Sequence, residues 1–182
     1  MKKWLGFTLF IVIYLLAAAF NLWSMEYQHT LKAKDMVFSW AIDNDQIHVE
    51  LSAKTTGWVG IGFNPEKSML DANIIIGAVK KGRVKIEDHF GNRKKGHTSD
   101  TKKGGTNHVK NPAGTEADGI TTISFTFPLN SGEKQFDASI KADGTDLIML
   151  AYGAGRDSFN SRHPFKAVYR INLKTGENKK VK

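Results

Sequence analysis

The side chains best suited to metal or redox chemistry in this sequence are methionine and histidine, because its 182 residues include no cysteine. The lack of thiols excludes disulfides, thiolate-bound zinc, iron–sulfur clusters, covalently attached c-type haem and cysteine nucleophiles. Met36 and Met149 lie in apolar runs that are typical of a core. Met69 lies instead in the polar connection Lys67-Ser68-Met69-Leu70-Asp71, where its thioether is either a packing group or a soft ligand.

His163 is the second candidate ligand. It lies in a Gly-rich polar segment, residues 153–165, between two apolar runs. Pro164 restricts the residue before it to extended geometry, which helps to aim the imidazole. A single histidine on a loop is otherwise usually just exposed, so spacing alone does not pair His163 with Met69.

A further group of potential metal ligands surrounds a long polar stretch, residues 91–119. This stretch has six Lys and Arg residues against three Asp and Glu and hardly any apolar residue, which predicts a long solvated or functional loop. The imidazoles and carboxylates in or beside it could bind zinc or copper, although their spacing matches no compact ligand motif; they are His89, His97, His108, Asp88 and Asp100.

Motifs of hydrolytic and nucleotide-binding enzymes are missing from the sequence. It holds no G-x-S-x-G, H-E-x-x-H or P-loop motif, and Gly60-Ile61-Gly62 falls inside a β-like run rather than before a helix. Asp143 and Asp146 lie in the turn 142–146, where the turn-forming tendency of Asp explains them better than acid–base catalysis. No catalytic residues are predicted, and the protein is not expected to be an enzyme by itself.

The elements that must position these residues are predicted to be β-strands. Residues 46–53 alternate apolar and polar side chains, with Ile47, Val49 and Leu51 facing inward. Ile74-Ile75-Ile76 is continuously apolar, which indicates a strand covered on both faces. A short helical turn fits residues 64–70. The pattern predicts an all-β sandwich or barrel with strands at 36–42, 46–53, 58–63, 73–79, 84–88, 121–127, 147–152 and 167–173.

Residues 1–24 have the features of an export signal. Met1-Lys2-Lys3 is a basic start, residues 4–23 carry no charge, and Ala17-Ala18-Ala19 offers a small-residue cleavage site. A cleaved signal peptide is favoured over an uncleaved membrane anchor, which the length of the apolar run would also permit. Residues 25–182 are then expected to be one extracytoplasmic domain, periplasmic or secreted, which meets a membrane only if the N-terminal segment is uncleaved.

The charge balance bears on partners. The 26 Lys and Arg residues against 18 Asp and Glu give a formal net charge of +8. This excess suits an acidic partner, but it is too small to indicate nucleic acid, which we do not expect an exported domain to bind.

Seven short motifs occur together in a recognisable order. They are Trp58-Val59-Gly60-Ile61-Gly62-Phe63, Met69, Asp71-Ala72-Asn73-Ile74-Ile75-Ile76-Gly77, Gly82-x-Val84-x-Ile86-x-Asp88, Phe125-Thr126-Phe127-Pro128-Leu129, Phe136-Asp137 and Ala151-Tyr152-Gly153. In this order they resemble the DOMON domain family over about residues 34–173. The resemblance implies an Ig-like antiparallel β-sandwich of the kind found in extracytoplasmic redox proteins, whose members bind haem or, it has been proposed, sugars.

The haem-binding members, such as the cytochrome domain of cellobiose dehydrogenase, hold b-type haem non-covalently between one Met and one His. Met69 and His163 occupy the corresponding places, so the resemblance implies that they are the axial ligands of haem b. Two protein ligands leave no position for oxygen, which suits electron transfer to a redox partner protein, for which an acidic surface would be complementary. The expected slot-lining residues are Trp58, Phe63, Ile75 and Tyr152, and the expected propionate partners are Arg156 and Arg162, with Lys166 as a further candidate.

Two other functions remain open from the sequence. One is a haem-free module that binds carbohydrate or another small ligand, for which the exported part offers only Trp40 and Trp58, both inside strand patterns. The other is a metal-binding loop domain that uses His89, His97 and His108.

Overall fold

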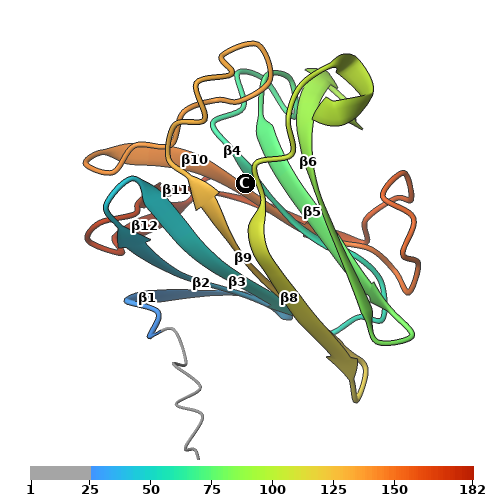
Figure 1. The fold of residues 1–182 in the computed structure, drawn as a ribbon. Helices are drawn as coiled ribbons and strands as arrows, with labels where there is room; N and C mark the ends of the chain where they lie inside the picture. The colour runs from blue at the N-terminus through green and yellow to red at the C-terminus, as the bar shows by residue number, and fades with distance from the viewer. Residues whose placement is uncertain (1–25) are drawn as a thin grey trace, which may run out of the picture.

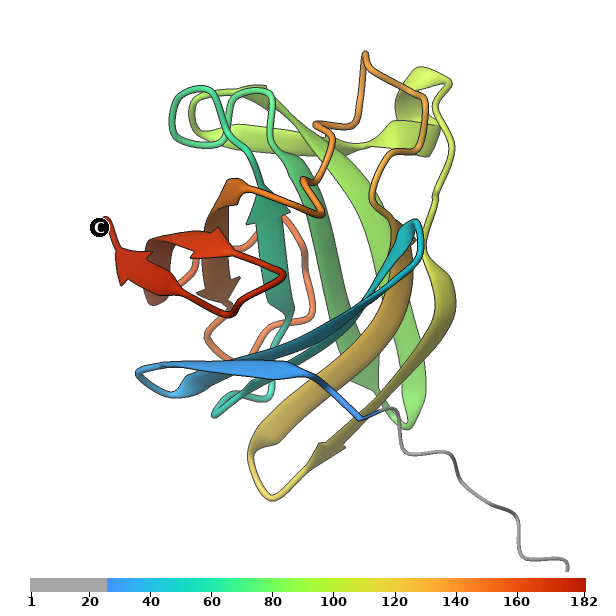
Figure 2. The ribbon, with the colours of Figure 1, turned by 90° about the vertical axis from the view of Figure 1, so that its left-hand side faces the viewer.

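Two antiparallel β-sheets packed face to face form the domain (Figures 1 and 2). The computed structural model describes residues 26–182, so the predicted export signal, residues 1–24, lies outside the described residues. One sheet has five strands in the order β1-β2-β3-β9-β8, and the other has seven in the order β12-β11-β10-β4-β5-β6-β7. The predicted all-β sandwich is therefore confirmed.

The strands have the following bounds. The five-stranded sheet consists of β1 (His29–Ala33), β2 (Met36–Asp43), β3 (Gln46–Ala53), β8 (Lys110–Ala117) and β9 (Ile120–Pro128). The seven-stranded sheet consists of β4 (Val59–Phe63), β5 (Asn73–Lys80), β6 (Arg83–Arg93), β7 (Gly96–Ser99), β10 (Thr145–Tyr152), β11 (Phe165–Asn172) and β12 (Asn178–Lys180). Within residues 26–182 the single helical element is a short 3-10 helix, η1 (Asp100–Lys103).

The main core lies between the sheets and follows the two-residue period of the strands. In β3 buried and half-buried residues alternate without exception, and the buried Ile47, Val49 and Leu51 all face the other sheet, as predicted. Trp40 and Phe38 of β2 stack in this core with ring centroids 4.5 Å apart. Burial of these large apolar side chains is the main source of stability in a domain without disulfides.

Strand β5 is covered on both faces, as its continuous apolar run predicted, because every residue from 73 to 79 is buried. Ile75 and Val79 belong to the core between the sheets. Ile76 and Ala78 belong to a second, smaller cluster with Trp58. The seven-stranded sheet therefore has an outer face, turned away from the five-stranded sheet, that is itself partly covered.

Two local predictions were wrong. Residues 91–119 are not a continuous loop, because they contain β7, η1 and β8. Strand β8 is exposed along almost its whole length and is held by backbone pairing with β9, so it has no alternating pattern for the sequence to display. Residues 64–70 form no helical turn but a tight loop closed by a bridge between Lys67 and Leu70.

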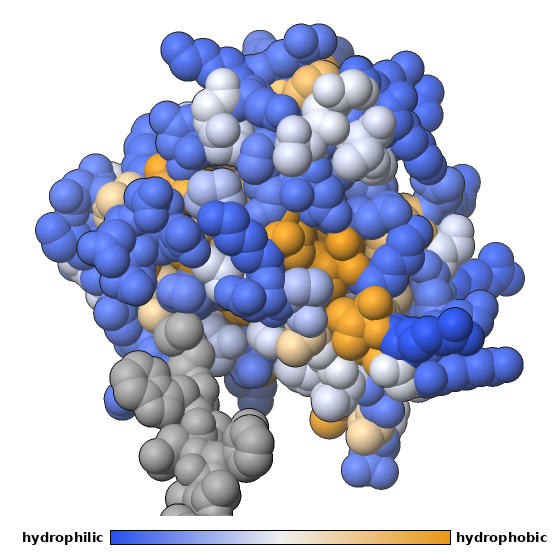
Figure 3. Space-filling model, viewed as in Figure 1, coloured by the Kyte–Doolittle hydropathy of each residue, from blue (hydrophilic) through white to orange (hydrophobic). Residues whose placement is uncertain are grey.

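The surface of the described residues is mostly polar, with a smaller apolar area near the middle of the view in Figure 3. Val84 and Val109 are half-buried and pack against the main core from the side where β6 and β8 approach each other. Within residues 26–182 no helix is both long enough and apolar enough to cross a bilayer.

Candidate functional site

The outer face of the seven-stranded sheet carries an apolar strip in which two glycines of β4 lie beside two isoleucines of β5. Gly60 and Gly62 of β4 pair with Ile76 and Ile74 of β5, and all four residues are buried. The tip of Met149 in β10 lies over Gly62, because a Cβ at position 62 would be 2.6 Å from its methyl carbon. This strip is an apolar part of the outer face, with Met149 packed over one of its glycines.

Met69 reaches the outer face on the loop between β4 and β5. Its backbone N–H donates to the Lys94 carbonyl at 3.4 Å, and Asp71 N–H donates to the Gly91 carbonyl at 2.8 Å. A Cβ at Gly91 would overlap the Met69 carbonyl oxygen, so only glycine allows the loop to lie against β6 here. Ser68 and Asp71 flank Met69 with φ of 63° and 59°, a strained turn that fixes the half-buried methionine.

His163 reaches the same face on the loop between β10 and β11, residues 153–164, which lies beyond β5 and β6 as the orange-red loop at the right of Figure 1. Trp58 anchors this loop, since its indole Nε1 donates to Ser161 Oγ at 2.9 Å. The His163 ring stands edge-on to Trp58, with centroids 6.3 Å apart and an interplanar angle of 89°. Burial, followed by the Lys166 charge, lowers the pKa of His163 and favours the neutral imidazole that binds metals.

Two further histidines stand on this face. His89 Nε2 lies 3.0 Å from a Glu87 carboxylate oxygen, and His89 Nδ1 lies 2.7 Å from His97 Nδ1. Because the carboxylate only accepts, neutral His89 donates from Nε2, and His97 Nδ1 donates to His89 Nδ1. Burial lowers the pKa of His89, and burial followed by the charges of His89 and His163 lowers that of His97 to about 4. The outer face therefore holds neutral imidazoles.

The predicted slot-lining residues divide between the two faces of the sheet. Trp58 is on the outer face with His163, whereas Phe63, Ile75 and Tyr152 lie in the core between the sheets. Tyr152 stacks on Phe165 there, with centroids 5.2 Å apart. The structure thus brings one of these four aromatic or apolar residues to the histidine and gives the other three a packing position.

An open, basic pocket adjoins the outer apolar strip. It has a volume of about 580 Å³, lies between the β5–β6 hairpin and the loop after β10, and is lined by Ala78, Lys80, Arg83, Lys85, Gly155, Arg156, Asp157, Ser158 and Phe159. Lys85 Nζ stands 5.2 Å from the centre of the Phe159 ring. Arg156, a predicted propionate partner, thus lines an electropositive pocket, whereas Arg162 is exposed and outside this lining.

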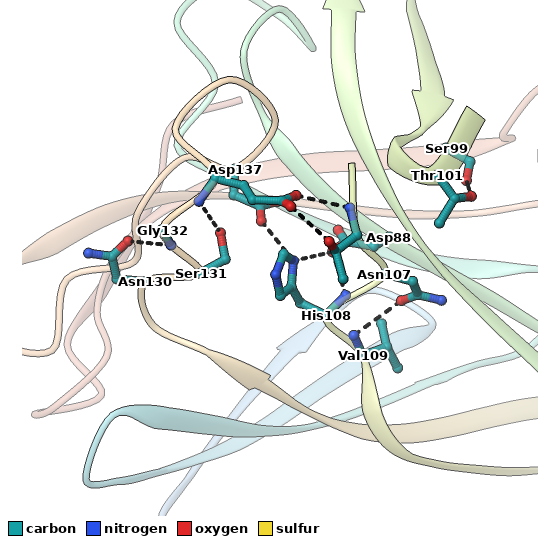
Figure 4. Close-up of polar contacts among 12 residues, drawn as sticks. Asp88, Ser99, Thr101, Asn107, His108, Val109, Asn130, Ser131, Gly132 and Asp137 are labelled. Carbon is teal, nitrogen blue, oxygen red and sulfur yellow. Dashed lines mark hydrogen bonds and ion pairs between the residues drawn. The ribbon is translucent and has the colours of Figure 1, made fainter. Parts of the chain in front are cut away.

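His108 lies on the other side of the sheet from His89 and His97. Its ring is 6.2 Å from that of Phe127 in the main core, and its backbone N–H donates to Asp88 at 3.1 Å (Figure 4). Asp88 and His89 are neighbours in β6 and so point to opposite faces. The predicted three-histidine metal loop is therefore wrong, because strand alternation separates His108 from the other two.

Around His108 the structure gathers carboxylates that the sequence pattern did not group. Burial, followed by the charges of Asp137 and Asp100, raises the pKa of Asp88 to about 9. Burial, followed by the Asp137 charge, raises the pKa of Asp100 to about 7, and burial also raises that of Asp137. Asp137 belongs to the segment after β9, and no local spacing in the sequence links it to β6. Only the long-range contact seen in the structure identifies it as a member of this group.

Comparison with known proteins defines the class to which this sandwich belongs. The model of the family described as "DOMON domain" matches residues 32–153. The chain belongs to the DOMON family, which confirms the resemblance seen in the sequence. Over 113 residues it is 32% identical to human "DBH-like monooxygenase protein 1", a match that covers 62% of this chain and 18% of that protein. The chain therefore spans less than a fifth of this relative.

Two solved structures share the fold. The cytochrome b domain of pyranose dehydrogenase from Coprinopsis cinerea has a TM-score of 0.58 at 14% identity, and the cytochrome domain of Myriococcum thermophilum cellobiose dehydrogenase has a TM-score of 0.59 at 9% identity. Each match covers 81% of this chain and 83% of the other. At these identities the likeness establishes the fold alone.

Proposed function

We propose that this protein is a haem-binding DOMON domain that transfers electrons outside the cytoplasm, with Met69 and His163 as axial ligands. The observation that carries the proposal is that the Met69 loop, which lies against Gly91 of β6, and the His163 loop, which Trp58 anchors, both border the outer face of the seven-stranded sheet. Thioether and neutral imidazole are a ligand pair that haem iron accepts in electron-transfer proteins.

The residues on this face fit a planar, mostly apolar group with an acidic edge. Gly60 and Gly62 carry no side chain, and Ile74, Ile76 and Met149 pack beside them as apolar contacts. The adjoining basic pocket, with Lys85 and Arg156 among its lining residues, offers cations to propionates. Because there is no cysteine, the slot and the two ligand residues would hold the haem without a covalent link.

The chain's own residues position the two ligands before any group binds. Gly91 and Lys94 fix the backbone of Met69, and Trp58, through its hydrogen bond to Ser161, fixes the loop that carries His163. Bound haem would supply a one-electron redox centre whose potential an axial methionine raises. With Met69 and His163 both holding the iron, no open position would remain for oxygen, so electron transfer would be favoured over oxygen chemistry.

The setting of the relatives supports a redox role. The two structural neighbours are named as cytochrome domains of dehydrogenases, and the human relative is named as a monooxygenase. We infer that this domain likewise serves a redox partner protein, and that Lys80, Arg83, Lys85 and Arg156 would favour a partner with an acidic surface. The predicted export signal at residues 1–24 supports an extracytoplasmic site of action.

The proposal is tested by visible spectroscopy of the full chain produced with haem supplied. We expect a low-spin b-type spectrum in the reduced protein, lost in both Met69→Ala and His163→Ala. Met36→Leu, a methionine change in the core between the sheets, is the matched control and should keep the spectrum. A colourless protein that takes up no added haem would refute the proposal and favour the carbohydrate-binding alternative. Haem uptake that survives both substitutions would refute the ligand assignment.

A further inference from the structure

We propose that Asp88, Asp137 and His108, with the buried Asp100 nearby, form a binding site for a divalent cation on the inner side of the seven-stranded sheet. The four residues come from β6, η1, the segment after β9 and the segment before β8. The site is distinct from the Met69–His163 face, because Asp88 points away from the side to which its neighbour His89 points.

The distances among these groups suit a single ion. His108 Nδ1 lies 3.2 Å from Asp137 Oδ2 and 3.5 Å from Asp88 Oδ2. One potential ligand atom from each of Asp88, His108 and Asp137 lies within 4.8 Å of the others. Ligand bonds of about 2.0–2.6 Å place two ligands of one ion up to about 5 Å apart, so these residues need little movement to share a cation. Figure 4 shows their side chains turned toward one another.

Buried oxygen atoms without partners point to a missing ligand. Asp88 and Asp100 are both 0% exposed. Asp88 Oδ1 and both carboxylate oxygens of Asp100 have no hydrogen-bond partner, and the nearest charged group to the Asp137 carboxylate is the His108 ring. Buried carboxylates are expensive unless they are paired, hydrogen-bonded or bound to a metal. A cation in their midst would satisfy all of them at once.

Asp146 shows how the same fold treats a buried aspartate with a structural role. It is also 0% exposed, but its carboxylate accepts hydrogen bonds from the Asn64 side chain and from Lys141 N–H. The sequence placed Asp146 in a turn, whereas it is the second residue of β10; these contacts nevertheless give it a structural role. The missing partners around Asp88 and Asp100 are therefore a local feature and not a general property of this domain.

No permanent cation of the chain neutralises the cluster. Among the ion pairs of residues 26–182, Asp88 and Asp137 have only His108 as a partner, and Asp100 has none. Lys102 and Lys103 on η1 are exposed. Mutual repulsion of the carboxylates accordingly favours an ion from solution.

The ligand chemistry narrows the class of ion. Carboxylate oxygens favour Mg²⁺, Ca²⁺ and Mn²⁺, whereas an imidazole nitrogen favours transition metals and zinc. Two carboxylates and one imidazole together favour an ion that accepts both kinds of ligand, such as Mn²⁺ or Zn²⁺. Such an ion would join four segments that are distant in the sequence and would stabilise the open edge where β6 and β8 approach each other.

The test is a titration of the metal-free, haem-free full chain with Mn²⁺ alone, followed through the loss of the free-ion electron paramagnetic resonance signal. We expect one Mn²⁺ per chain, displaced by Zn²⁺, and an affinity that falls roughly 100-fold in Asp88→Asn and Asp137→Asn. Two variants should bind normally, because their side chains lie on the outer face: Glu87→Gln, next to Asp88 in β6, and His97→Asn.

The proposal fails if neither Mn²⁺ nor Zn²⁺ binds, or if binding survives in Asp88→Asn. It also fails if His97→Asn abolishes binding, since the ion would then lie on the outer face. Thermal unfolding separates loss of ligands from loss of fold. Asp88→Asn should remain folded because the amide has nearly the same size and shape as the carboxyl group that it replaces. Added Mn²⁺ should raise the melting temperature of the parent chain but not of this variant. These outcomes do not depend on haem.

Discussion

The two faces of β6 carry opposite chemistries one residue apart. On the outer face, His89 and its neighbours are neutral imidazoles beside bare glycine backbone and apolar side chains. On the inner face, Asp88 joins carboxylates that lack partners. Because strand residues alternate between faces, two sites can share one strand without sharing a single side chain. Closeness in the sequence is therefore a poor guide to which residues of a strand act together.

The position of the Met69 loop on the outer face depends on the close contact between its backbone and Gly91 of β6. Replacing Gly91 by Ala places a Cβ on the Met69 carbonyl oxygen, so the loop must move away from β6. We expect a loss of about 3 kcal/mol in the free energy of unfolding, measured by urea denaturation, together with loss of haem binding.

The control for this change is Gly82→Ala in the β5–β6 turn. Its φ is +73° and a Cβ there would meet nothing within 4 Å, so only backbone strain of about 1 kcal/mol is expected, with haem binding kept. Mn²⁺ binding in a folded Gly91→Ala protein should persist. If both sites failed together, the two faces would not be independent.

The buried carboxylates of the inner face should make the stability of the protein depend on pH. The pKa values of Asp88 and Asp100 are raised to about 9 and about 7, so the folded state holds their protons more tightly than the unfolded chain does. In chelator, the free energy of unfolding should therefore fall as pH rises from about 4 towards 9. Denaturant unfolding at several pH values measures this slope.

Asp88→Asn should flatten the slope above pH 6, and added Mn²⁺ should restore the stability of the parent chain at high pH. A slope that is equal in the parent and in Asp88→Asn would show that other groups cause it, and that the inner carboxylates are not held protonated in the fold.

The central strands could be predicted from the sequence, and the edge strands could not. All eight predicted strands exist, whereas β1, β8, β7 and β12, which were not predicted, are the outermost strands of the two sheets. A central strand such as β3 buries every second residue and so displays the alternating pattern. An edge strand such as β8 is exposed on both faces, and its position follows from backbone pairing, which leaves no trace in side-chain type.

The candidate sites also differ in how far the sequence could predict them. The family resemblance predicted Met69 and His163, and the structure places the loops of both on one face. The sequence grouped His89, His97 and His108 because all three lie in or beside a polar stretch, although strand alternation separates His108 from the other two. Asp137 and Asp88 meet only because two connections converge at one end of the sandwich. Such convergence depends on the packing of the whole domain.

A smaller effect of pH is expected on the outer face, with the opposite sign. The pKa of His97 is lowered to about 4, so the unfolded chain binds its proton more tightly than the folded state does. Stability should therefore be lost as pH falls from about 6.5 to 4, by on the order of 1–2 kcal/mol. His97→Asn, compared with the parent chain across this range, should remove that part of the loss. If His97→Asn lost as much stability between pH 6.5 and 4 as the parent chain, His97 would be solvated in the folded protein.

The smallest expected effect concerns the anchor of the His163 loop. Ser161→Ala removes the acceptor for the Trp58 indole N–H but leaves both rings in place. Because Trp58 is only 4% exposed, its N–H would lose its partner in a largely dry position, at a cost of about 1 kcal/mol. The loop should loosen, so haem should dissociate faster while Mn²⁺ affinity stays the same, which transfer of haem to an apo-globin and the manganese titration would measure. The matched control is Ser158→Ala, which removes an exposed hydroxyl from the same loop. If the two variants behaved alike, the Trp58–Ser161 hydrogen bond would have no part in holding His163 over the sheet.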